Sequence, residues 1–173
     1  MNYLTGGVCR TIDFHSEDAE ANDCKNEFDE MVELTDDQGD FPVFLSATLN
    51  NDANKEEMEA DGLITGHAYS VMEAVEVCGE KLVCLRNPWG KFEWKGSFSD
   101  GSAELLRVKG DLSKIVDPGL VDGNEDGSFW MAFDDFRSFF WEVGICDPWE
   151  LGVLSEITRE GTCVDTLTGD QHK

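Results

Sequence analysis

Residues 66–87, GHAYSVMEAVEVCGEKLVCLRN, decide the fold of this chain. Apolar and polar residues alternate along 66–77, which predicts a long β-strand. Cys78, Gly79 and Glu80 are typical of a turn, and the apolar run over 81–87 predicts a second strand. Two strands joined by so short a turn form an antiparallel hairpin.

The predicted hairpin carries two polar side chains at its open end. His67 opens the first strand and Asn87 closes the second. We expect a three-residue turn over 78–80, so that facing residues differ by an even number and His67 and Asn87 share one face. An asparagine oxygen can hold the proton of one ring nitrogen and leave the other nitrogen as a base, as in a nucleophile–His–Asn site. Trp89 would shield that contact from water, while a surface or structurally satisfied histidine is the alternative.

The rest of the chain predicts a β-rich α+β fold of antiparallel strands with a few short helices. Further strands are predicted over 41–49, 128–133 and 142–146, and the aromatic stretch 92–98 is expected to be extended. Together with the hairpin, these strands indicate a half-domain built on one sheet.

The sequence pattern for helices is weaker than the pattern for strands. Phe28, Met31, Val32 and Thr35 predict an amphipathic helix over 24–35, with Asp23 as its cap. Other helices are expected around 102–108 and from a capping Asp134 through Phe140, and the acidic connection 50–61 is expected to be a loop.

Composition excludes several classes of function. The 173 residues carry 37 acidic and 13 basic side chains, a formal net charge of −24. Such a field repels phosphates, so we expect no nucleic-acid partner, and no segment is apolar enough for a membrane span. The chain starts without the layout of a secretion signal, so we expect a cytoplasmic protein whose six cysteines are free thiols.

One acidic loop resembles part of a calcium site. Residues 122–127, DGNEDG, place oxygen donors at alternating positions before a glycine. An EF-hand is excluded because its twelfth position is Phe133, inside a predicted strand. Glu93 and Asp100 are candidates for the missing ligands, and a plain acidic surface turn is the alternative. A zinc site at Cys78 and Cys84 is excluded because no second Cys or His pair lies nearby.

Three segments of the sequence resemble the second half of the calpain protease core. They are GLITGHAYSV at 62–71, LVCLRNPWGKFEWKGSFSD at 82–100 and DGSFWMAFDDF at 126–136. LTGGV at 4–8 resembles the calpain segment that joins the first half to the second. Calpains are intracellular, calcium-dependent cysteine endopeptidases with a papain-like arrangement, so the resemblance implies a papain-like second half-domain.

The resemblance implies roles for individual residues. His67 falls on the catalytic histidine, Asn87 on the catalytic asparagine, and Trp89 on the tryptophan beside it, which is linked to gating the site when calcium is absent. It also implies a calcium site. Its ligands would be Glu93, Asp100, Asp126 and a main-chain carbonyl near Asn124. A further family carboxylate falls on Ser128, which would weaken the site.

The resemblance also implies a domain division and a missing part. We expect a protease core over 1–147, with an acidic, variable insert region at 16–61, and a polar tail or the start of a following domain at 148–173. The family's nucleophilic Cys lies in a first half ahead of LTGG, and no cysteine here has its sequence context. We therefore expect a His/Asn subdomain that is inactive alone and that acts on protein or peptide substrates with a Cys-bearing first half, in the same parent chain or in trans. The alternative is a catalytically dead, calcium-sensitive binding or regulatory module.

Overall fold

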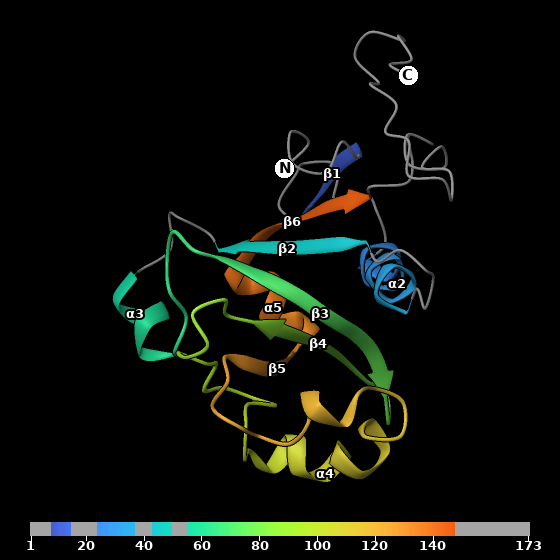
Figure 1. The fold of residues 1–173 in the computed structure, drawn as a ribbon, viewed down its shortest axis with the longest axis vertical. Coiled ribbons are helices and arrows are strands. Elements are labelled where there is room, and N and C mark those ends of the chain that lie inside the picture. The colour runs from blue at the N-terminus through green and yellow to red at the C-terminus, as the bar shows by residue number, and fades with distance from the viewer. Residues whose placement is uncertain (1–7, 15–23, 37–42, 50–54, 148–173) are drawn as a thin grey trace, which may run out of the picture.

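A twisted antiparallel sheet forms the frame of the molecule (Figure 1). The computed structural model describes residues 8–14, 24–36, 43–49 and 55–147. Six strands within these ranges follow the order β1-β6-β2-β3-β4-β5. The strands are β1 (Val8–Asp13), β2 (Phe44–Leu49), β3 (Ala68–Val77), β4 (Glu80–Arg86), β5 (Ser128–Ala132) and β6 (Phe140–Asp147), and the helices are α2 (Cys24–Thr35), α3 (Lys55–Ala60), α4 (Ala103–Leu112) and α5 (Phe133–Phe139). The β-rich α+β class expected from the sequence is confirmed.

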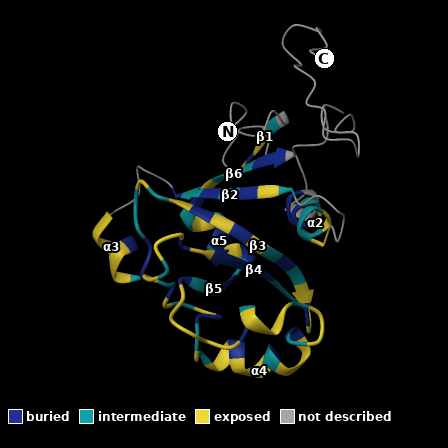
Figure 2. Cartoon of the chain, viewed as in Figure 1, coloured by how far each residue is buried: buried dark blue, intermediate teal, exposed yellow. Residues whose placement is uncertain are grey.

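Strand β4 is buried on both faces of the sheet, and this explains its continuous apolar sequence. Val83 and Leu85 face a large core shared with α2 and α5. Leu82 and Cys84 face the opposite way, into a smaller core covered by α4. Because successive side chains of a strand point to opposite faces, only a strand covered on both sides reads as an unbroken apolar run. Figure 2 shows the buried residues along the middle of the sheet and beneath the helices.

The large core owes much of its volume to aromatic side chains from the helices. Phe28 and Met31 of α2 and Phe133 and Phe136 of α5 are almost completely buried in it. Phe28 and Met31 lie three residues apart and so share one helix face, which confirms the helix predicted over 24–35. The predicted cap, Asp23, lies outside the described residues.

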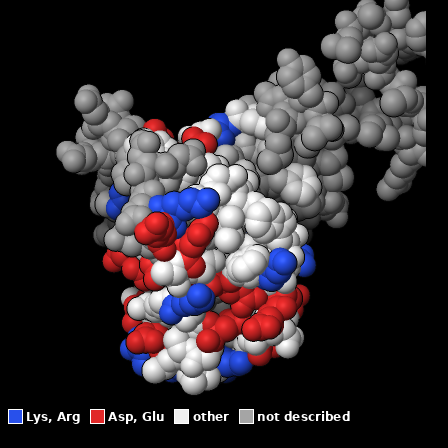
Figure 3. All heavy atoms as spheres, turned by 90° about the vertical axis from the view of Figure 1, so that its left-hand side faces the viewer, with Lys and Arg blue, Asp and Glu red and all other residues white. Residues whose placement is uncertain are grey.

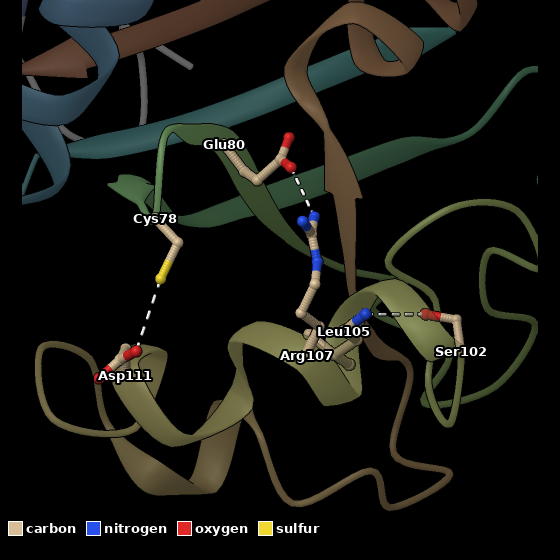
Figure 4. Close-up of polar contacts among 6 residues, drawn as sticks. All are labelled: Cys78, Glu80, Ser102, Leu105, Arg107 and Asp111. Atoms are coloured by element: carbon tan, nitrogen blue, oxygen red, sulfur yellow. Dashed lines mark hydrogen bonds and ion pairs between the residues drawn. The ribbon is translucent and has the colours of Figure 1, made fainter.

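Two side-chain contacts hold the middle and the C-terminal end of helix α4 against the turn of the β3–β4 hairpin (Figure 4). Its first turn is capped by Ser102, whose side chain accepts a hydrogen bond from the backbone N–H of Leu105 at 3.2 Å. Farther along, the Arg107 guanidinium donates to Glu80 at 2.5 Å, and the Cys78 thiol contacts Asp111 at 3.5 Å. The apolar side of α4 is buried, so the whole helix covers the second face of the sheet.

The hairpin turn differs from its prediction. Val77 pairs with Glu80, so the turn has two residues, Cys78 and Gly79, and not three. Both have positive φ angles, 53° and 81°, as a tight hairpin turn of the type I′ family requires. A two-residue turn alone would put His67 and Asn87 on opposite faces of the ribbon.

A β-bulge restores the expected relation between the two strands. The register shifts between Val71 and Glu73, so Met72 has no partner, and beyond this point Ser70 pairs with Arg86. The extra residue changes the parity of every later pair. The prediction of a shared face was therefore correct in its result, although the turn length on which it rested was wrong.

Three smaller predictions were wrong. Residues 55–60 form α3 and not a loop; Met58 is its one buried apolar residue, which leaves no periodic pattern to read. Helix α5 starts at Phe133, so Asp134 lies in its first turn and is not its cap. Residues 92–98 were expected to be extended throughout, but positive φ angles at Phe92 and Phe98 turn the chain at both ends of this stretch.

The remaining segments agree with the sequence. Strands are confirmed at the described part of 41–49, at 128–132 and at 142–146, whereas Phe133 belongs to α5 and not to the strand predicted over 128–133. The helix predicted around 102–108 continues to Leu112. Figure 3 shows acidic side chains over much of the face at the left of Figure 1, with fewer Lys and Arg between them. Among the described residues, no helix is both long and apolar enough to cross a membrane.

Candidate active site

His67 and Asn87 meet at the open end of the β3–β4 hairpin. His67 directly precedes β3 and Asn87 directly follows β4. The His67 Nε2 atom lies 2.8 Å from the Asn87 Oδ1 atom, a hydrogen-bond distance. Twenty residues of sequence separate them, and the tight turn and the bulge of the hairpin bring them together.

The hydrogen bonds of Asn87 fix which way its amide points. Its Nδ2 atom donates to the backbone carbonyls of Lys91 at 2.7 Å and Phe92 at 3.3 Å. Its Oδ1 atom accepts the backbone N–H of Trp89 at 3.0 Å. A flipped amide would set an N–H group against a backbone N–H and an oxygen against two carbonyls, so the oxygen must face His67.

This orientation selects one tautomer of the neutral imidazole. The Asn87 oxygen can only accept, so the proton lies on Nε2 of His67 and Nδ1 keeps a free lone pair. Asn87 is completely buried, whereas His67 is half-buried. The arrangement therefore presents an oriented proton acceptor at the molecular surface, held by an amide that solvent does not reach.

Two aromatic rings hold the imidazole in place. The ring of Tyr69 meets it edge-on, with ring centroids 5.2 Å apart, and the Trp89 indole lies at 4.4 Å. Trp89 is itself 56% exposed, so it covers one side of His67 while remaining open to solvent. The Tyr69 hydroxyl accepts the backbone N–H of Ile64 at 2.8 Å, and burial raises the pKa of this phenol.

Sequence reasoning missed Tyr69. It lies two residues after His67 and therefore on the same face of the strand, which is the signal that would have identified it.

Gly127 forms the backbone support of Asn87. The Asn87 N–H donates to the Gly127 carbonyl at 2.8 Å, and the Gly127 N–H donates to the Glu93 carboxylate at 2.7 Å. Gly127 has a φ angle of +89°, and a Cβ atom there would lie 2.6 Å from the Asn87 carbonyl oxygen and 2.8 Å from the Gly90 Cα atom. Only glycine fits this position without displacing the backbone of the site.

The carboxylates predicted to bind calcium gather beside this support. Burial first, and then the charges of Glu93, Asp126 and Asp122 in that order, together raise the pKa of Asp100 to about 6. A pocket of about 900 Å³ is lined by both Glu93 and Asp100. The oxygen-only donor set suits a hard cation, and added positive charge would relieve the repulsion that Asp100 experiences.

Carboxylates of the same acidic loop also accept hydrogen bonds from N–H groups of that loop. Asp122 accepts the N–H and side-chain amide of Asn124, and Asp126 accepts the N–H of Ser128 at 2.8 Å. In the described part of the chain, no three His, Cys, Asp or Glu side chains lie close enough to hold a metal ion as they stand. The donor chemistry therefore fits calcium, whereas the side chains do not form a closed set of ligands.

The described cysteines lie away from His67. Cys78 is at the far end of β3, roughly 30 Å along the strand at 3.3 Å per residue. Cys84 is completely buried on the α4 side, and burial strongly raises the pKa of its thiol. Cys9 and Cys146 pair at the β1–β6 edge of the sheet. The sulfur that a nucleophile–His–Asn site requires is thus not supplied by these four thiols.

Comparisons with known proteins establish the family. A sequence model of the calpain family cysteine proteases matches residues 1–147. Human calpain-9 is 38% identical over 151 residues, which cover 85% of this chain and 20% of the relative. Calpain clp-4 of Caenorhabditis elegans is 41% identical over 109 residues, covering 60% of this chain and 15% of the relative. The calpain-type cysteine protease DEK1 of Arabidopsis thaliana is 31% identical over 145 residues, covering 83% of this chain and 6% of the relative.

The chain belongs to the calpain family of cysteine proteases. It spans a fifth or less of the length of these three relatives.

Proposed function

We propose that this chain is the His/Asn subdomain of a calpain-type cysteine endopeptidase that cleaves protein or peptide substrates. The observation that carries the proposal is the 2.8 Å contact between His67 Nε2 and Asn87 Oδ1, which leaves the lone pair of Nδ1 available to take a proton. Family membership supports the class of reaction. The nucleophile would come from a Cys-bearing first half, in the same parent chain or in trans, and a cytoplasmic location is part of the proposal.

In that arrangement His67 moves the protons of the reaction. Its Nδ1 atom takes the proton of the thiol, and the resulting thiolate attacks the peptide carbonyl. The imidazolium then gives this proton to the departing amine as the C–N bond breaks and a thioester remains. His67 next takes a proton from water, which attacks the thioester and releases the acid and the thiol.

Asn87 and Trp89 act through the position of the imidazole. Rotation of the ring about Cβ–Cγ would break the bond to Asn87 and carry Nδ1 away from the thiol, so Asn87 keeps the base aligned between the two proton transfers. Trp89 covers the ring from one side and slows exchange of the His67–Asn87 bond with water. These two residues are positioning residues, whereas His67 is the one that handles the proton.

We further propose that calcium binds beside Asn87. The carboxylates of Glu93, Asp100 and Asp126 and a main-chain carbonyl near Asn124 would hold it, and the ion would supply positive charge that offsets their mutual repulsion. Two contacts lead from this cluster to the site, from Glu93 to the Gly127 N–H and from the Gly127 carbonyl to the Asn87 N–H. A change at the carboxylates therefore reaches the backbone of Asn87 through two hydrogen bonds.

Reconstitution tests the catalytic proposal. The chain would be fused to, or mixed with, the Cys-bearing first half of a calpain relative, and cleavage of a fluorogenic peptide would be measured. We expect cleavage that His67→Ala abolishes and that the matched control His172→Ala leaves intact. A folded, reconstituted pair that binds peptide but shows no cleavage would support the regulatory module instead.

A calcium titration followed by tryptophan fluorescence tests the metal proposal. Asp126→Asn should weaken the response, because it removes one charge and keeps the shape of the side chain. Ser128→Asp should strengthen it, because it adds a carboxylate where the family pattern has one. Asp134→Asn, an exposed acidic residue on α5, is the control and should change nothing. An unchanged titration curve for Asp126→Asn would exclude Asp126 as a ligand.

A further inference from the structure

Two cysteines face each other across the β1–β6 edge of the sheet. Cys9 pairs directly with Cys146, within an antiparallel register that runs unbroken from Val8–Asp147 to Asp13–Glu142. Directly opposed residues of antiparallel strands have Cα atoms about 4.5–5.5 Å apart and side chains on the same face. Disulfides span Cα separations of about 4.4–6.8 Å, so the separation typical of directly opposed residues lies within the range that a disulfide bridges.

The two thiols already interact. A hydrogen bond with the Cys146 side chain is the main cause that raises the pKa of the Cys9 thiol. Cys9 is partly exposed and Cys146 is buried. Cys9 is therefore the sulfur that a small oxidant in solution can reach, and Cys146 lies next to it, ready to complete a bridge without solvent access of its own.

We propose that Cys9 and Cys146 form a reversible disulfide that fastens β1 to β6, with a low-molecular-weight disulfide such as oxidised glutathione as the oxidant. The Cys9 thiolate attacks one sulfur of the oxidant, forms a mixed disulfide and releases the other half as a thiolate. The Cys146 thiolate then attacks the Cys9 sulfur and displaces the second half. Two protein thiols are oxidised and one small disulfide is reduced; the two protons end on the released thiols.

The bridge acts on an edge strand. In the described sheet, β1 is hydrogen-bonded to β6 alone, so its position depends on this one pairing. The bridge would close a loop of more than 100 residues, for which a large restriction of the unfolded chain is expected. Oxidation should therefore stabilise the fold and hold the start of β1 in place, directly after the residues that resemble the calpain connection between halves.

The proposed bridge is remote from the His67–Asn87 contact. On β2, Phe44 pairs with Cys146, whereas Thr48 pairs with Ala68, the residue after His67. Four residues along β2 and two strand spacings across the sheet separate the two places, roughly 15–20 Å. The inference therefore does not rest on the proposed function, and oxidation should leave the His67 site intact.

The other described thiols lack such a partner arrangement. Cys78 is exposed, but its thiol contacts Asp111, and this hydrogen bond is the main cause that raises its pKa. Cys84 is completely buried in the core under α4. Cys78 is therefore the matched control for an exposed thiol that has no cysteine opposite it among the described residues.

The experiment equilibrates the full chain with glutathione redox buffers at about pH 8, followed by acid quenching, thiol counting and peptide mapping. We expect accessible thiols under denaturing conditions to fall from six to four, and the linked peptide to join Cys9 to Cys146. The melting temperature of the oxidised form should rise by about 5 °C or more, since closing a long loop stabilises small domains. Cys9→Ser should abolish both changes, and Cys78→Ser should leave both intact.

Two results would overturn the proposal. One is a folded chain that keeps six thiols in the most oxidising buffer, and the other is a linked peptide that joins a different pair. Cys9→Ser lies on a partly exposed edge and is expected to fold, which circular dichroism of the reduced protein would verify. Because the thiolate is the attacking form, oxidation should also be slower at pH 7 than at pH 8.

Discussion

Replacing Asn87 by alanine should cost the molecule considerably more stability than replacing most other polar residues. The Asn87 amide makes four hydrogen bonds, to His67, Trp89, Lys91 and Phe92, and the side chain is completely buried. At a net value of about 1 kcal/mol for each good bond, with less for the 3.3 Å contact to Phe92, the loss is about 2–4 kcal/mol. Part of it reflects backbone groups left without a partner.

Urea denaturation followed by tryptophan fluorescence measures this loss. The matched control is Asn124→Ala, an exposed asparagine whose side chain bonds only within its own turn, and its change should stay within about 0.5 kcal/mol. His67→Ala removes just one of the four bonds of Asn87 and should cost about 1 kcal/mol. If Asn87→Ala and Asn124→Ala have equal effects, the idea that Asn87 organises this loop is refuted.

The isosteric variant Asn87→Asp separates shape from hydrogen-bond direction. A carboxylate keeps the acceptor toward His67 but sets a second oxygen against the carbonyls of Lys91 and Phe92. At neutral pH we expect a loss at least as large as that of Asn87→Ala. Acidification should reduce the loss, because a protonated carboxyl can donate to Lys91. A stability equal to wild type at neutral pH would show that the amide donors contribute nothing.

Two further substitutions test neighbouring parts of the structure. Gly127→Ala should lower the free energy of unfolding, measured by urea denaturation, by about 2–4 kcal/mol, because of the positive φ angle and the clash with the Asn87 carbonyl. The control Gly110→Ala, in open space on α4, should be neutral or stabilising. Equal effects of the two substitutions would refute the close approach of Gly127 to the Asn87 backbone. Burial, and then the charge of a neighbouring aspartate, raises the pKa of Glu73 to about 7. Between about pH 4.5 and pH 7 the folded chain therefore keeps a proton that the unfolded chain loses. This carboxyl makes the free energy of unfolding fall as the pH rises through that range. Glu73→Gln should remove that part of the pH dependence and stabilise the protein at pH 8, whereas Glu76→Gln, exposed on the same strand, should not; identical pH profiles of Glu73→Gln and wild type would contradict the assignment.

Local pattern was sufficient to predict the hairpin and most strands. Alternation over 66–77 and the apolar run of β4 are direct consequences of which faces are covered. The contact between His67 and Asn87 was predicted from the even difference between their residue numbers, but two errors in that reasoning cancelled. The turn is one residue shorter than expected, and the bulge at Met72 adds one residue. A bulge depends on the packing of the whole sheet and leaves no clear mark in a single sequence.

The contacts that support Asn87 could not be predicted from local sequence pattern. Glu93 and Gly127 are 34 residues apart in sequence, and their hydrogen bond exists only because the loops after β4 and before β5 lie side by side. Helix α3 has Met58 as its one buried apolar residue, so it shows no amphipathic repeat. Tyr69, in contrast, was predictable, because it shares a strand face with His67.

The tautomer of His67 tests the central claim most directly. Long-range ¹H–¹⁵N correlation spectra of the labelled chain, recorded where the imidazole is neutral and assigned with His67→Ala, distinguish a protonated Nε2 from a protonated Nδ1. The account predicts the Nε2–H tautomer in the wild type and a mixture of both tautomers in Asn87→Ala. A wild-type ring protonated on Nδ1, or one that Asn87→Ala leaves unchanged, would contradict it.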